Sequence, residues 1–390
     1  MKWKFYSLAF VAGMSILTAC SSDDNNDNDG NGGNGNGNEI ENGTILKGTI
    51  TSDVTLAAGN TYKLSGEYIV EEGATLHIEE GVKIIAVYDD IADYILVKQG
   101  GKINAVGTPD KPIVMTSEKE EPGAWGGIHI CGRAHTNAEG GKGSSEIGGA
   151  VYGGNDDADN SGTLQYIRLE YTGFAFDEEH EANGISFYSV GNGTIVDHCQ
   201  AYKGSDDGFE FFGGSVNVSN LVAVSCSDDS FDWTEGWNGK GTNLVAYQED
   251  KSTLGYDCDC LMECDNNGSN NAATPVAHPV LKNLILVGNG GSKQGIRLRA
   301  GTEVEIDNAK VCGKGQPLTV ETALTENALK NGTSKLTNIT LTSELSSKEG
   351  IYTHADFIAV TSNKVDANLS YSSFEDIRKE CSWMNGSWVK

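Results

Sequence analysis

The stretch SDDGFEFF, Ser205 to Phe212, recurs 22 residues further along the chain as SDDSFDWT, Ser227 to Thr234. In each copy a pair of acids precedes a run in which inward and outward positions alternate. Alternation with a period of two is typical of a β-strand with one buried face. A strand that returns after a fixed interval predicts that each copy is one rung of a coil, because periods of this length are characteristic of solenoids.

Two families of short segments repeat across the chain. The first begins with a small residue and comprises GIHIC from Gly127, GISFY from Gly184, GFEFF from Gly208, SFDWT from Ser230, GYDCD from Gly255 and GIRLR from Gly295. The second lies between members of the first and comprises NLVAVS from Asn220, NLVAYQ from Asn243, NLILVG from Asn283 and NITLTS from Asn338.

Steps of about 22 to 24 residues that carry two or three short strands fit one turn of a parallel β-helix. Leucine-rich repeats share this period, but they require a Leu/Asn signature and one helix per repeat, and the sequence has neither. Three longer gaps predict loop insertions, at 133–161, 261–280 and 300–337. Insertions leave a solenoid on one side and commonly build its binding surface.

The N-terminus predicts an exported, lipid-anchored protein. Residues 1–19 combine two lysines, an apolar stretch and a cleavage motif, Leu17-Thr18-Ala19-Cys20, that resembles the bacterial lipobox. That resemblance implies a lipid on Cys20. Residues 20–43 are rich in Gly, Asn and Asp and should form a flexible tether. The alternative is an ordinary secretory signal in which Cys20 is incidental.

An acidic run follows Cys20 directly, as Ser21-Ser22-Asp23-Asp24. It resembles the signal that sends lipoproteins of Bacteroidota to the outside of the outer membrane. The resemblance implies a protein anchored in the outer membrane and facing the cell exterior.

The charge of the chain restricts its partners. The formal net charge is -27, so nucleic acid is excluded as a partner, because binding a phosphate backbone requires a basic face. A strongly anionic polysaccharide would also be repelled unless bound cations bridge it. Solubility at a crowded surface is a sufficient alternative explanation of the charge.

Cysteine usage permits disulfides without specifying them. The chain has 9 cysteines, and those other than Cys20 are even in number, as expected of an exported protein with disulfides. Cys258, Cys260 and Cys264 lie close together but without the paired spacing of a zinc site. Disulfides or buried thiols are therefore favoured over a metal here.

Several segments resemble a known architecture. They are YIVEEGATLHIEEGVKIIA from Tyr68, YILVKQGGKINAVGTPDKPIVMTS from Tyr94, PGAWGGI from Pro122, and the DDGFEFFGG and DDSFDW runs. Together they are similar to the right-handed parallel β-helix lipoproteins of Bacteroidota, within the pectate-lyase-like superfamily, over roughly residues 44 to 300. This superfamily includes lyases, hydrolases, adhesins and proteins with no known activity, so the resemblance implies a fold rather than a function.

The expected organisation is therefore an all-β chain. Residues 44–312 should form a right-handed parallel β-helix with loop insertions, and residues 313–390 its final coils and a small C-terminal cap. Because solenoids need capping, Trp383 and Trp388 are interpreted as lids over the open end of the last coil. The alternative is that they stack on sugars.

Alternation assigns side chains to the two faces of each rung. If Phe209 and Phe211 point into the coil, Glu210 points out, and likewise Phe231 and Trp233 point in. This predicts one outward column of His129, Ser186, Glu210, Asp232, Asp257 and Arg297, and beside it a second column of Cys131, Tyr188, Phe212, Thr234, Asp259 and Arg299.

Stacked carboxylates in the first column need compensation. Rungs about 4.8 Å apart give a repulsion of roughly 1 kcal/mol per adjacent pair in water, and more in a shielded groove. A cation, a shared proton, Arg297 or a ligand's hydroxyls would offset it. A calcium site is one candidate, formed by Asp207, Glu210, Asp229, Asp232 and Asp257. The alternative is that the paired acids form turns and an exposed, solvated ladder.

Three functions follow from this column. The first is non-catalytic binding of a polysaccharide or adhesion, with Tyr188, Phe212 and Arg299 as ligand contacts. The second is a calcium-assisted polysaccharide lyase or a glycoside hydrolase. Its candidate catalytic residues are Glu210, Asp232, Asp257 and Arg297. In lyases of the superfamily acids hold calcium while an arginine or lysine removes a proton, which implies such a role for Arg297 or Arg299 by analogy. The third is a structural surface component without a small ligand.

Overall fold

The computed structural model describes residues 38–89, 91–176 and 180–390. The predicted signal peptide at 1–19, the predicted lipid site at Cys20 and most of the predicted tether at 20–43 lie outside the described residues. Within the described part of the chain, no helix is both long and apolar enough to cross a membrane.

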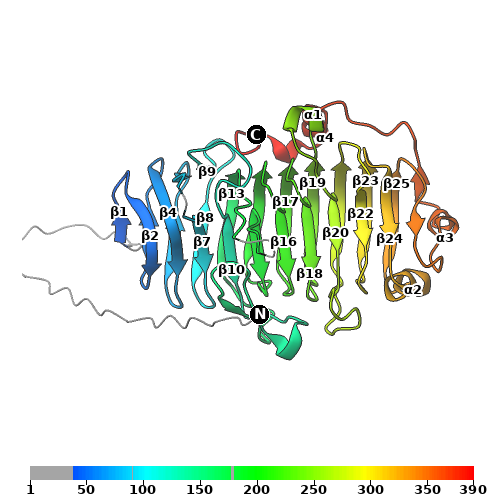
Figure 1. Ribbon diagram of the computed structural model, residues 1–390, viewed down its shortest axis with the longest axis horizontal. Helices are drawn as coiled ribbons and strands as arrows, with labels where there is room; N and C mark the ends of the chain where they lie inside the picture. Colours follow the sequence, from blue (N-terminus) through cyan, green and yellow to red (C-terminus); the bar gives the residue numbers. More distant parts are fainter. Residues whose placement is uncertain (1–37, 90, 177–179) are drawn as a thin grey trace, which may run out of the picture. The chain divides into compact units, whose positions relative to one another are not determined.

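The described chain winds into a parallel β-helix, as Figure 1 shows. The prediction of an all-β, right-handed β-helix is thereby confirmed. Rung pairing starts at Asn38, which lies opposite Val54, so the coil begins before the predicted start at residue 44. The strands of the first coils are β1 (Asn38–Ile40), β2 (Ile45–Ile50), β3 (Val54–Leu56), β4 (Thr61–Val70), β5 (Thr75–Ile78), β6 (Lys83–Ala86), β7 (Tyr94–Val97), β8 (Lys102–Val106) and β9 (Ile113–Ser117).

Later coils each contribute one short and one long strand. The short strands form one wall of the coil, here termed the short-strand wall, and they are β10 (Ile128–Cys131), β14 (Ile185–Tyr188), β16 (Phe209–Phe212), β18 (Phe231–Thr234), β20 (Met262–Cys264), β22 (Gln294–Leu298), β24 (Gln316–Val320) and β26 (Ser346–Ser347). The long strands form the long-strand wall, and they are β13 (Gly162–Glu170), β15 (Ile195–Tyr202), β17 (Asn217–Val224), β19 (Lys240–Tyr247), β21 (Val280–Val287), β23 (Glu305–Cys312), β25 (Lys335–Leu341) and β27 (Lys364–Val365).

Each strand of the long-strand wall from β13 to β25 is two strands joined by a bend, whereas β27 is a single short strand. The bend residue takes positive φ, as in Asn220 at 55°, Asn243 at 60° and Asn283 at 59°. Asparagine tolerates this left-handed conformation better than most residues. These asparagines stack on successive rungs and bond to one another through their amides, since Asn243 Nδ2 donates to Asn220 Oδ1 at 2.8 Å and Asn283 Nδ2 donates to Asn243 Oδ1 at 3.0 Å. The second repeat family thus encodes an asparagine ladder.

Aromatic side chains fill the interior of the coil. Phe187 and Phe211 stack with ring centroids 5.1 Å apart, and Phe209 and Phe231 with centroids 5.6 Å apart. Trp233 is buried in the same cluster. The prediction that these aromatics point inward is confirmed, because alternation places them on the enclosed face of each rung.

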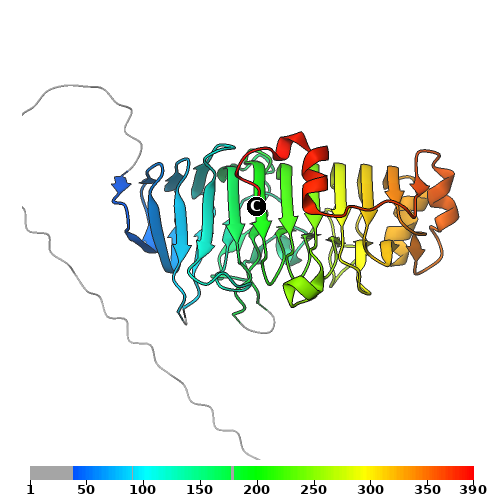
Figure 2. The same cartoon turned by 90° about the horizontal axis from the view of Figure 1, so that it is seen from above.

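Helices close the last coil, and the C-terminal segment runs elsewhere. Leu329 of α2 (Ala323–Asn331) and Phe357 of α3 (His354–Ala359) belong to the core of the coil. Beyond α3 the chain runs back along the long-strand wall, through α4 (Phe374–Glu380), to the middle of the coil, as Figure 2 shows. Trp388 is buried there among strand residues such as Val222 and Val245. The expectation that Trp383 and Trp388 cover the open end is therefore wrong.

The insertions agree in part with expectation. Residues 133–161 do leave the coil and carry β11 (Gly143–Ser144) and β12 (Val151–Tyr152). Residues 300–337 are not an insertion as a whole, because they contain β23 and β24. These two strands continue the β-helix by pairing with β21 and β22. The eight cysteines of the described chain are buried and unpaired, so the thiol interpretation holds over disulfides.

Candidate functional site

The outward column of the short-strand wall holds a run of acids. Ser186 pairs with Glu210, and Glu210 pairs with Asp232, as predicted. The next rung places Glu263 opposite Asp232, and Arg297 follows Glu263. Glu263 therefore occupies the position that the sequence had assigned to Asp257.

Asp257 lies outside the column, so its predicted stacking is wrong. It follows α1 (Lys251–Leu254), a short helix that ends at Gly255 in the left-handed conformation. Gly255 resembles the small residue that opens each rung, yet here it closes a helix. The Asp257 carboxylate is exposed and lies 3.7 Å from Lys251 Nζ.

The acids that precede each rung hold the rungs together. Asp207 Oδ1 accepts a hydrogen bond of 2.8 Å from the backbone amide of Asp229, and Asp229 Oδ1 accepts one of 2.6 Å from the amide of Cys260. Each of these two carboxylates is buried. Each carboxylate uses one oxygen to accept a hydrogen bond from the backbone of the next rung. Its other oxygen can still bind a ligand together with the neighbouring acids, so the turn-forming and ligand roles are compatible.

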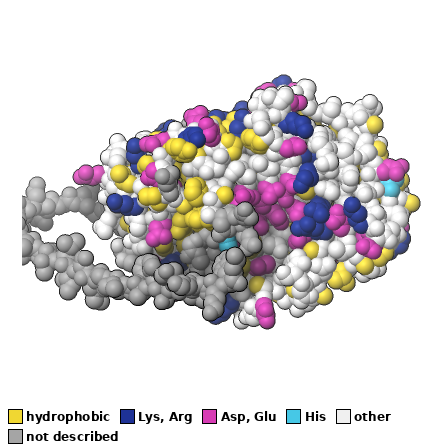
Figure 3. All heavy atoms as spheres, in the orientation of Figure 1, with side chains coloured by type: hydrophobic (Ala, Val, Ile, Leu, Met, Phe, Trp, Pro, Cys, Tyr) yellow, Lys and Arg dark blue, Asp and Glu magenta, His cyan; other side chains and the backbone are white. Residues whose placement is uncertain are grey.

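These carboxylates converge on a small polar cavity, here termed the acidic pocket. It measures about 240 Å³ and is lined by Glu146, Glu181, Asn183, Asp206, Asp207, Glu210, Asp228 and Asp232. Figure 3 shows a patch of Asp and Glu side chains on this face, with Lys and Arg side chains beside it. Oxygens of Asp207, Glu210 and Asp232 lie within 4.8 Å of one another.

Burial and mutual repulsion make these acids hard to ionise. Burial, followed by the charge of Asp228, raises the pKa of Asp206 to about 7. Burial also raises the pKa values of Asp207, Glu210 and Asp232 well above the ordinary range, and neighbouring carboxylates add to the effect. Without a compensating charge, part of the cluster would hold protons near neutral pH.

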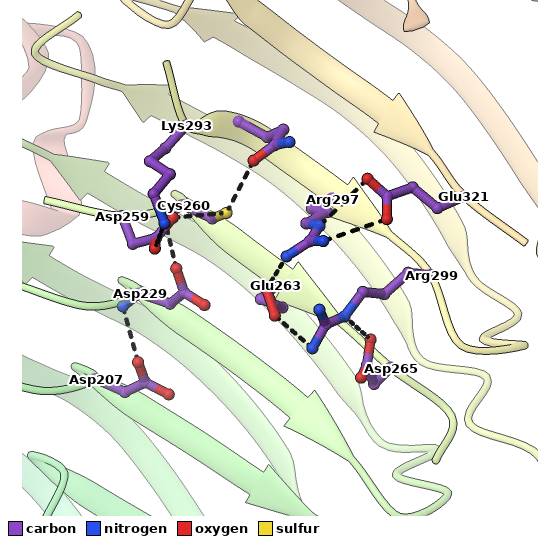
Figure 4. A network of polar contacts seen from close by, with 11 residues as sticks. Asp207, Asp229, Asp259, Cys260, Glu263, Asp265, Lys293, Arg297, Arg299 and Glu321 are labelled. Atoms are coloured by element: carbon purple, nitrogen blue, oxygen red, sulfur yellow. Dashed lines mark hydrogen bonds and ion pairs between the residues drawn. The ribbon is translucent and has the colours of Figure 1, made fainter. Parts of the chain in front are cut away.

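Two arginines form ion pairs with acids at one end of the column, as Figure 4 shows. Arg297 lies 3.0 Å from Glu263 and 3.3 Å from Glu321, and Arg299 lies 2.6 Å from Glu263 and 2.7 Å from Asp265. Lys293 pairs with Asp259 in the same region. Across the described ranges, no lysine or arginine forms an ion pair with the acids that line the acidic pocket.

Three pocket residues, Asn183, Glu181 and Glu146, were not predicted from the sequence. Asn183 stands immediately before Gly184, as Asp207 stands before Gly208, so aligning the repeats one residue further back would have found it. Its Nδ2 donates to Glu210 Oε2 at 2.6 Å, while its Oδ1 is buried without a hydrogen-bond partner. Glu146 comes from the 133–161 insertion, which follows no period and therefore gives no signal.

The predicted aromatic contacts are covered. The Tyr188 and Phe212 rings stack with centroids 4.4 Å apart, and these side chains are 0% and 8% exposed. Tyr152 and Ile147 of the 133–161 insertion lie in the same apolar cluster. A ligand would have to displace the insertion to reach these rings, so their assignment as ligand contacts is contradicted. Arg299 remains on the surface but is held by its two acids.

The pocket has the chemistry of a hard-cation site. Carboxylate oxygens from two adjacent rungs and their turns face one another, and Asn183, whose buried amide oxygen has no hydrogen-bond partner, lines the same pocket. Calcium takes six to eight oxygen ligands of these kinds. Asp207, Glu210 and Asp232 would supply the centre of such a site, with Asp206 and Asn183 at its edge.

Comparison with known proteins identifies the family of the chain. The family model for the pectate-lyase-like beta helix domain matches residues 48–389. No curated protein matches the chain significantly. Among solved structures, the Dettilon tailspike protein is similar at a TM-score of 0.30 and 8% identity, over 76% of this chain and 56% of the tailspike. The chain thus spans little more than half of that relative. From the extent of the family match, the chain belongs to the pectate-lyase-like β-helix domain family.

Proposed function

We propose that this protein binds an acidic polysaccharide without cleaving it, through a calcium ion held in the acidic pocket. The observation that carries the proposal is the convergence of buried carboxylates that form no ion pair with a lysine or arginine among the described residues, in a pocket that Asn183, with its unpartnered Oδ1, also lines. An unpaired buried charge is costly. A divalent cation would remove that cost and would also satisfy the amide oxygen.

The size of the pocket favours an ion over a sugar ring. Ligand pockets for small organic molecules usually occupy about 300–1,000 Å³, whereas the acidic pocket measures about 240 Å³. Calcium accepts many oxygens in irregular geometry, while magnesium demands a near-ideal octahedron and retains its waters. The crowded, asymmetric set of acids therefore fits calcium better than magnesium.

A bound calcium ion would explain how an acidic protein binds an acidic polymer. The net charge of -27 repels uronate chains at a distance. An ion on the short-strand wall would reduce the local negative charge and present coordination positions to a carboxylate of the polymer. The wall is built from parallel rungs, which give a chain-like ligand a repeating surface to follow.

The environment of the arginines supports binding rather than a lyase reaction. Although burial lowers the pKa of Arg297, its contacts with Glu321 and Glu263 outweigh burial and raise that pKa further. An arginine that retains its proton so firmly is a poor general base. Glycosidases pair an acid of raised pKa with a second carboxyl group that stays ionised, whereas burial raises the pKa values of both Glu210 and Asp232.

We further propose that Cys20 anchors the protein by lipid to the outer membrane, with the coil facing the cell exterior, as in the lipoproteins of Bacteroidota. The lipobox-like motif and the acidic run after Cys20 support this location. Labelling with radioactive palmitate, compared between the full chain and Cys20→Ser, tests the anchor, and surface proteolysis of whole cells tests its orientation. Unlabelled wild-type protein would refute the anchor.

Calorimetric titration with calcium chloride tests the pocket directly. We expect one or more calcium ions to bind the wild-type protein, and Asp232→Asn to weaken binding at least tenfold, because Asp232 lies at the centre of the cluster. Asp257→Asn is the matched control, since Asp257 is an exposed acid outside the pocket. Equal losses in the two variants, or no binding by the wild type, would contradict a specific site.

The glycan is tested on the same variants. Affinity electrophoresis through gels containing polygalacturonate or alginate should retard the wild-type protein in calcium but not in EDTA. Asp232→Asn should migrate freely under both conditions. Unsaturated uronate products, followed by ultraviolet absorbance, would instead establish a lyase, and the absence of both retardation and turnover on these polymers would favour a structural surface component.

A further inference from the structure

A groove lies on the long-strand wall, between the asparagine ladder and the C-terminal segment. It has a volume of about 380 Å³, within the range of small-ligand sites. One side is formed by the ladder residues Asn243, Asn283 and Asn308. The other side is formed by Glu380, Cys381 and Trp383 of the segment that Figure 2 shows lying along the coil.

The ladder fixes a row of amides with unused hydrogen-bonding capacity. Asn308 Nδ2 donates to Asn283 Oδ1 at 2.9 Å, and Asn283 Nδ2 donates to Asn243 Oδ1 at 3.0 Å. Each amide therefore uses one of its two N–H donors, and each carbonyl keeps a lone pair. Within the described chain no group donates to Asn308 Oδ1. The groove thus presents donors and acceptors at the spacing of the rungs, roughly 4.8 Å.

The amides are also rigid. Asn243, Asn283 and Asn308 take φ values of 60°, 59° and 65°, a conformation that few other residues adopt readily. Their side chains are held by the amide-to-amide bonds. Ligand binding would therefore cost little side-chain entropy, which is the main advantage of a preorganised site.

Trp383 supplies an aromatic wall. It is half-buried, and it is braced by Trp388 with ring centroids 6.2 Å apart and by His198 at 6.3 Å. The charged side chains of the groove, Lys310 and Glu380, form an ion pair with each other. The groove therefore carries no unpaired charge from its lining residues, in contrast to the acidic pocket.

We propose that this groove is a binding site for an uncharged saccharide. A pyranose ring combines an apolar C–H face, which an indole ring covers well, with equatorial hydroxyls that both donate and accept hydrogen bonds. The groove offers an indole and a row of fixed amides. Its balanced charge favours a neutral sugar over a uronate or an amino sugar.

This site is independent of the acidic pocket. The groove lies on β19, β21 and β23 of the long-strand wall, whereas the acidic pocket lies on the short-strand wall. No carboxylate of the acidic pocket lines it. Saccharide binding in this groove should therefore persist in EDTA, so the failure of one proposal is distinguishable from the failure of the other.

The test is calorimetric titration of the purified protein in EDTA with mannotriose, xylotriose, cellotriose and laminaritriose. We expect at least one of these neutral trisaccharides to bind and to perturb the tryptophan fluorescence. Asn308→Gly keeps the backbone conformation and removes the amide, and Trp383→Phe keeps an aromatic ring but shortens it. Each should weaken binding by about tenfold or more, which is the range of a well-packed contact.

Melting temperatures show whether the variants fold, and Asp257→Asn, at an exposed acid that lines neither site, serves as the variant expected to bind normally. Two outcomes would overturn the proposal. The first is that none of the four trisaccharides binds the wild-type protein. The second is that binding is unchanged in both Asn308→Gly and Trp383→Phe, because the saccharide would then lie outside the groove.

Discussion

Without calcium, the protein should lose stability as the pH rises from 5 to 8. Burial and the neighbouring Asp228 charge raise the pKa of Asp206 to about 7 in the folded protein, whereas an unfolded aspartate titrates near ~3.9. A group whose pKa is raised by folding stabilises the fold while it is protonated. Its contribution is complete below about pH 4 and is lost as the pH rises through about 7.

The contribution of Asp206 sets a minimum for the loss, because burial also raises the pKa values of Asp207, Glu210 and Asp232. Each tenfold change in proton affinity is worth ~1.4 kcal/mol, so the ionisation of Asp206 between pH 5 and 8 should remove about 3 kcal/mol. Asp228 is exposed, and solvent screens its charge, so it adds little. In a chain of this length the loss corresponds to a fall of roughly 5 °C in Tm. Calcium at a hundredfold excess over its dissociation constant would restore ~2.7 kcal/mol.

Thermal unfolding followed by circular dichroism at pH 5, 6, 7 and 8, in EDTA and in calcium chloride, provides the assay. The stabilisation by calcium should be small at pH 5, where protons compete for the carboxylates, and largest at pH 8. Asp206→Asn should flatten the pH dependence in EDTA. A Tm in EDTA that rises across this range, or a calcium effect equal at both extremes, would refute the assignment of the pocket.

Three further predictions concern the rest of the fold. Asn283→Ala should destabilise the protein by about 2–3 kcal/mol in urea unfolding, because it removes two side-chain hydrogen bonds and places alanine at a positive φ. Asn283→Gly should cost less, since glycine accepts that conformation. Equal losses in the two variants would show that the backbone conformation is not responsible. Trp388→Ala should cost about 3–4 kcal/mol and speed hydrogen exchange along the long-strand wall, and unchanged exchange there would place the C-terminal segment elsewhere. Dithiothreitol should leave the Tm unchanged, because the described cysteines are unpaired, whereas a fall in Tm would reveal disulfides.

The coil and its interior could be predicted because the sequence repeats the relevant physics in every turn. A small residue opens each rung, and alternation then places residues such as Phe211 inside and Glu210 outside. The same logic located Asp207 and Asp232 beside each other. It also implied Asn183, which occupies the position of Asp207 one rung earlier and was overlooked.

The remaining features depend on segments that follow no period. The segment before β20 contains the short helix α1, which ends at Gly255. This glycine resembles the small residue that opens a rung, so the sequence predicts Asp257 at the position that Glu263 occupies. The cover over Tyr188 comes from the 133–161 insertion, whose path is set by tertiary packing. The route of the C-terminal segment likewise depends on an apolar stripe contributed by many coils, which no local pattern reveals.

The return of the C-terminal segment changes how the protein can come apart. In a simple solenoid each coil touches only its neighbours, so unravelling can begin at an end and advance one turn at a time. Here the backbone amide of Ser387 donates to Pro109 O at 2.8 Å, and the amide of Lys390 donates to Gln200 Oε1 at 2.8 Å. The last residues are thereby hydrogen-bonded to coils formed much earlier in the chain. If the coils at the far end fray, these hydrogen bonds remain. The unfolding of the stack should therefore be more cooperative than that of a simple solenoid.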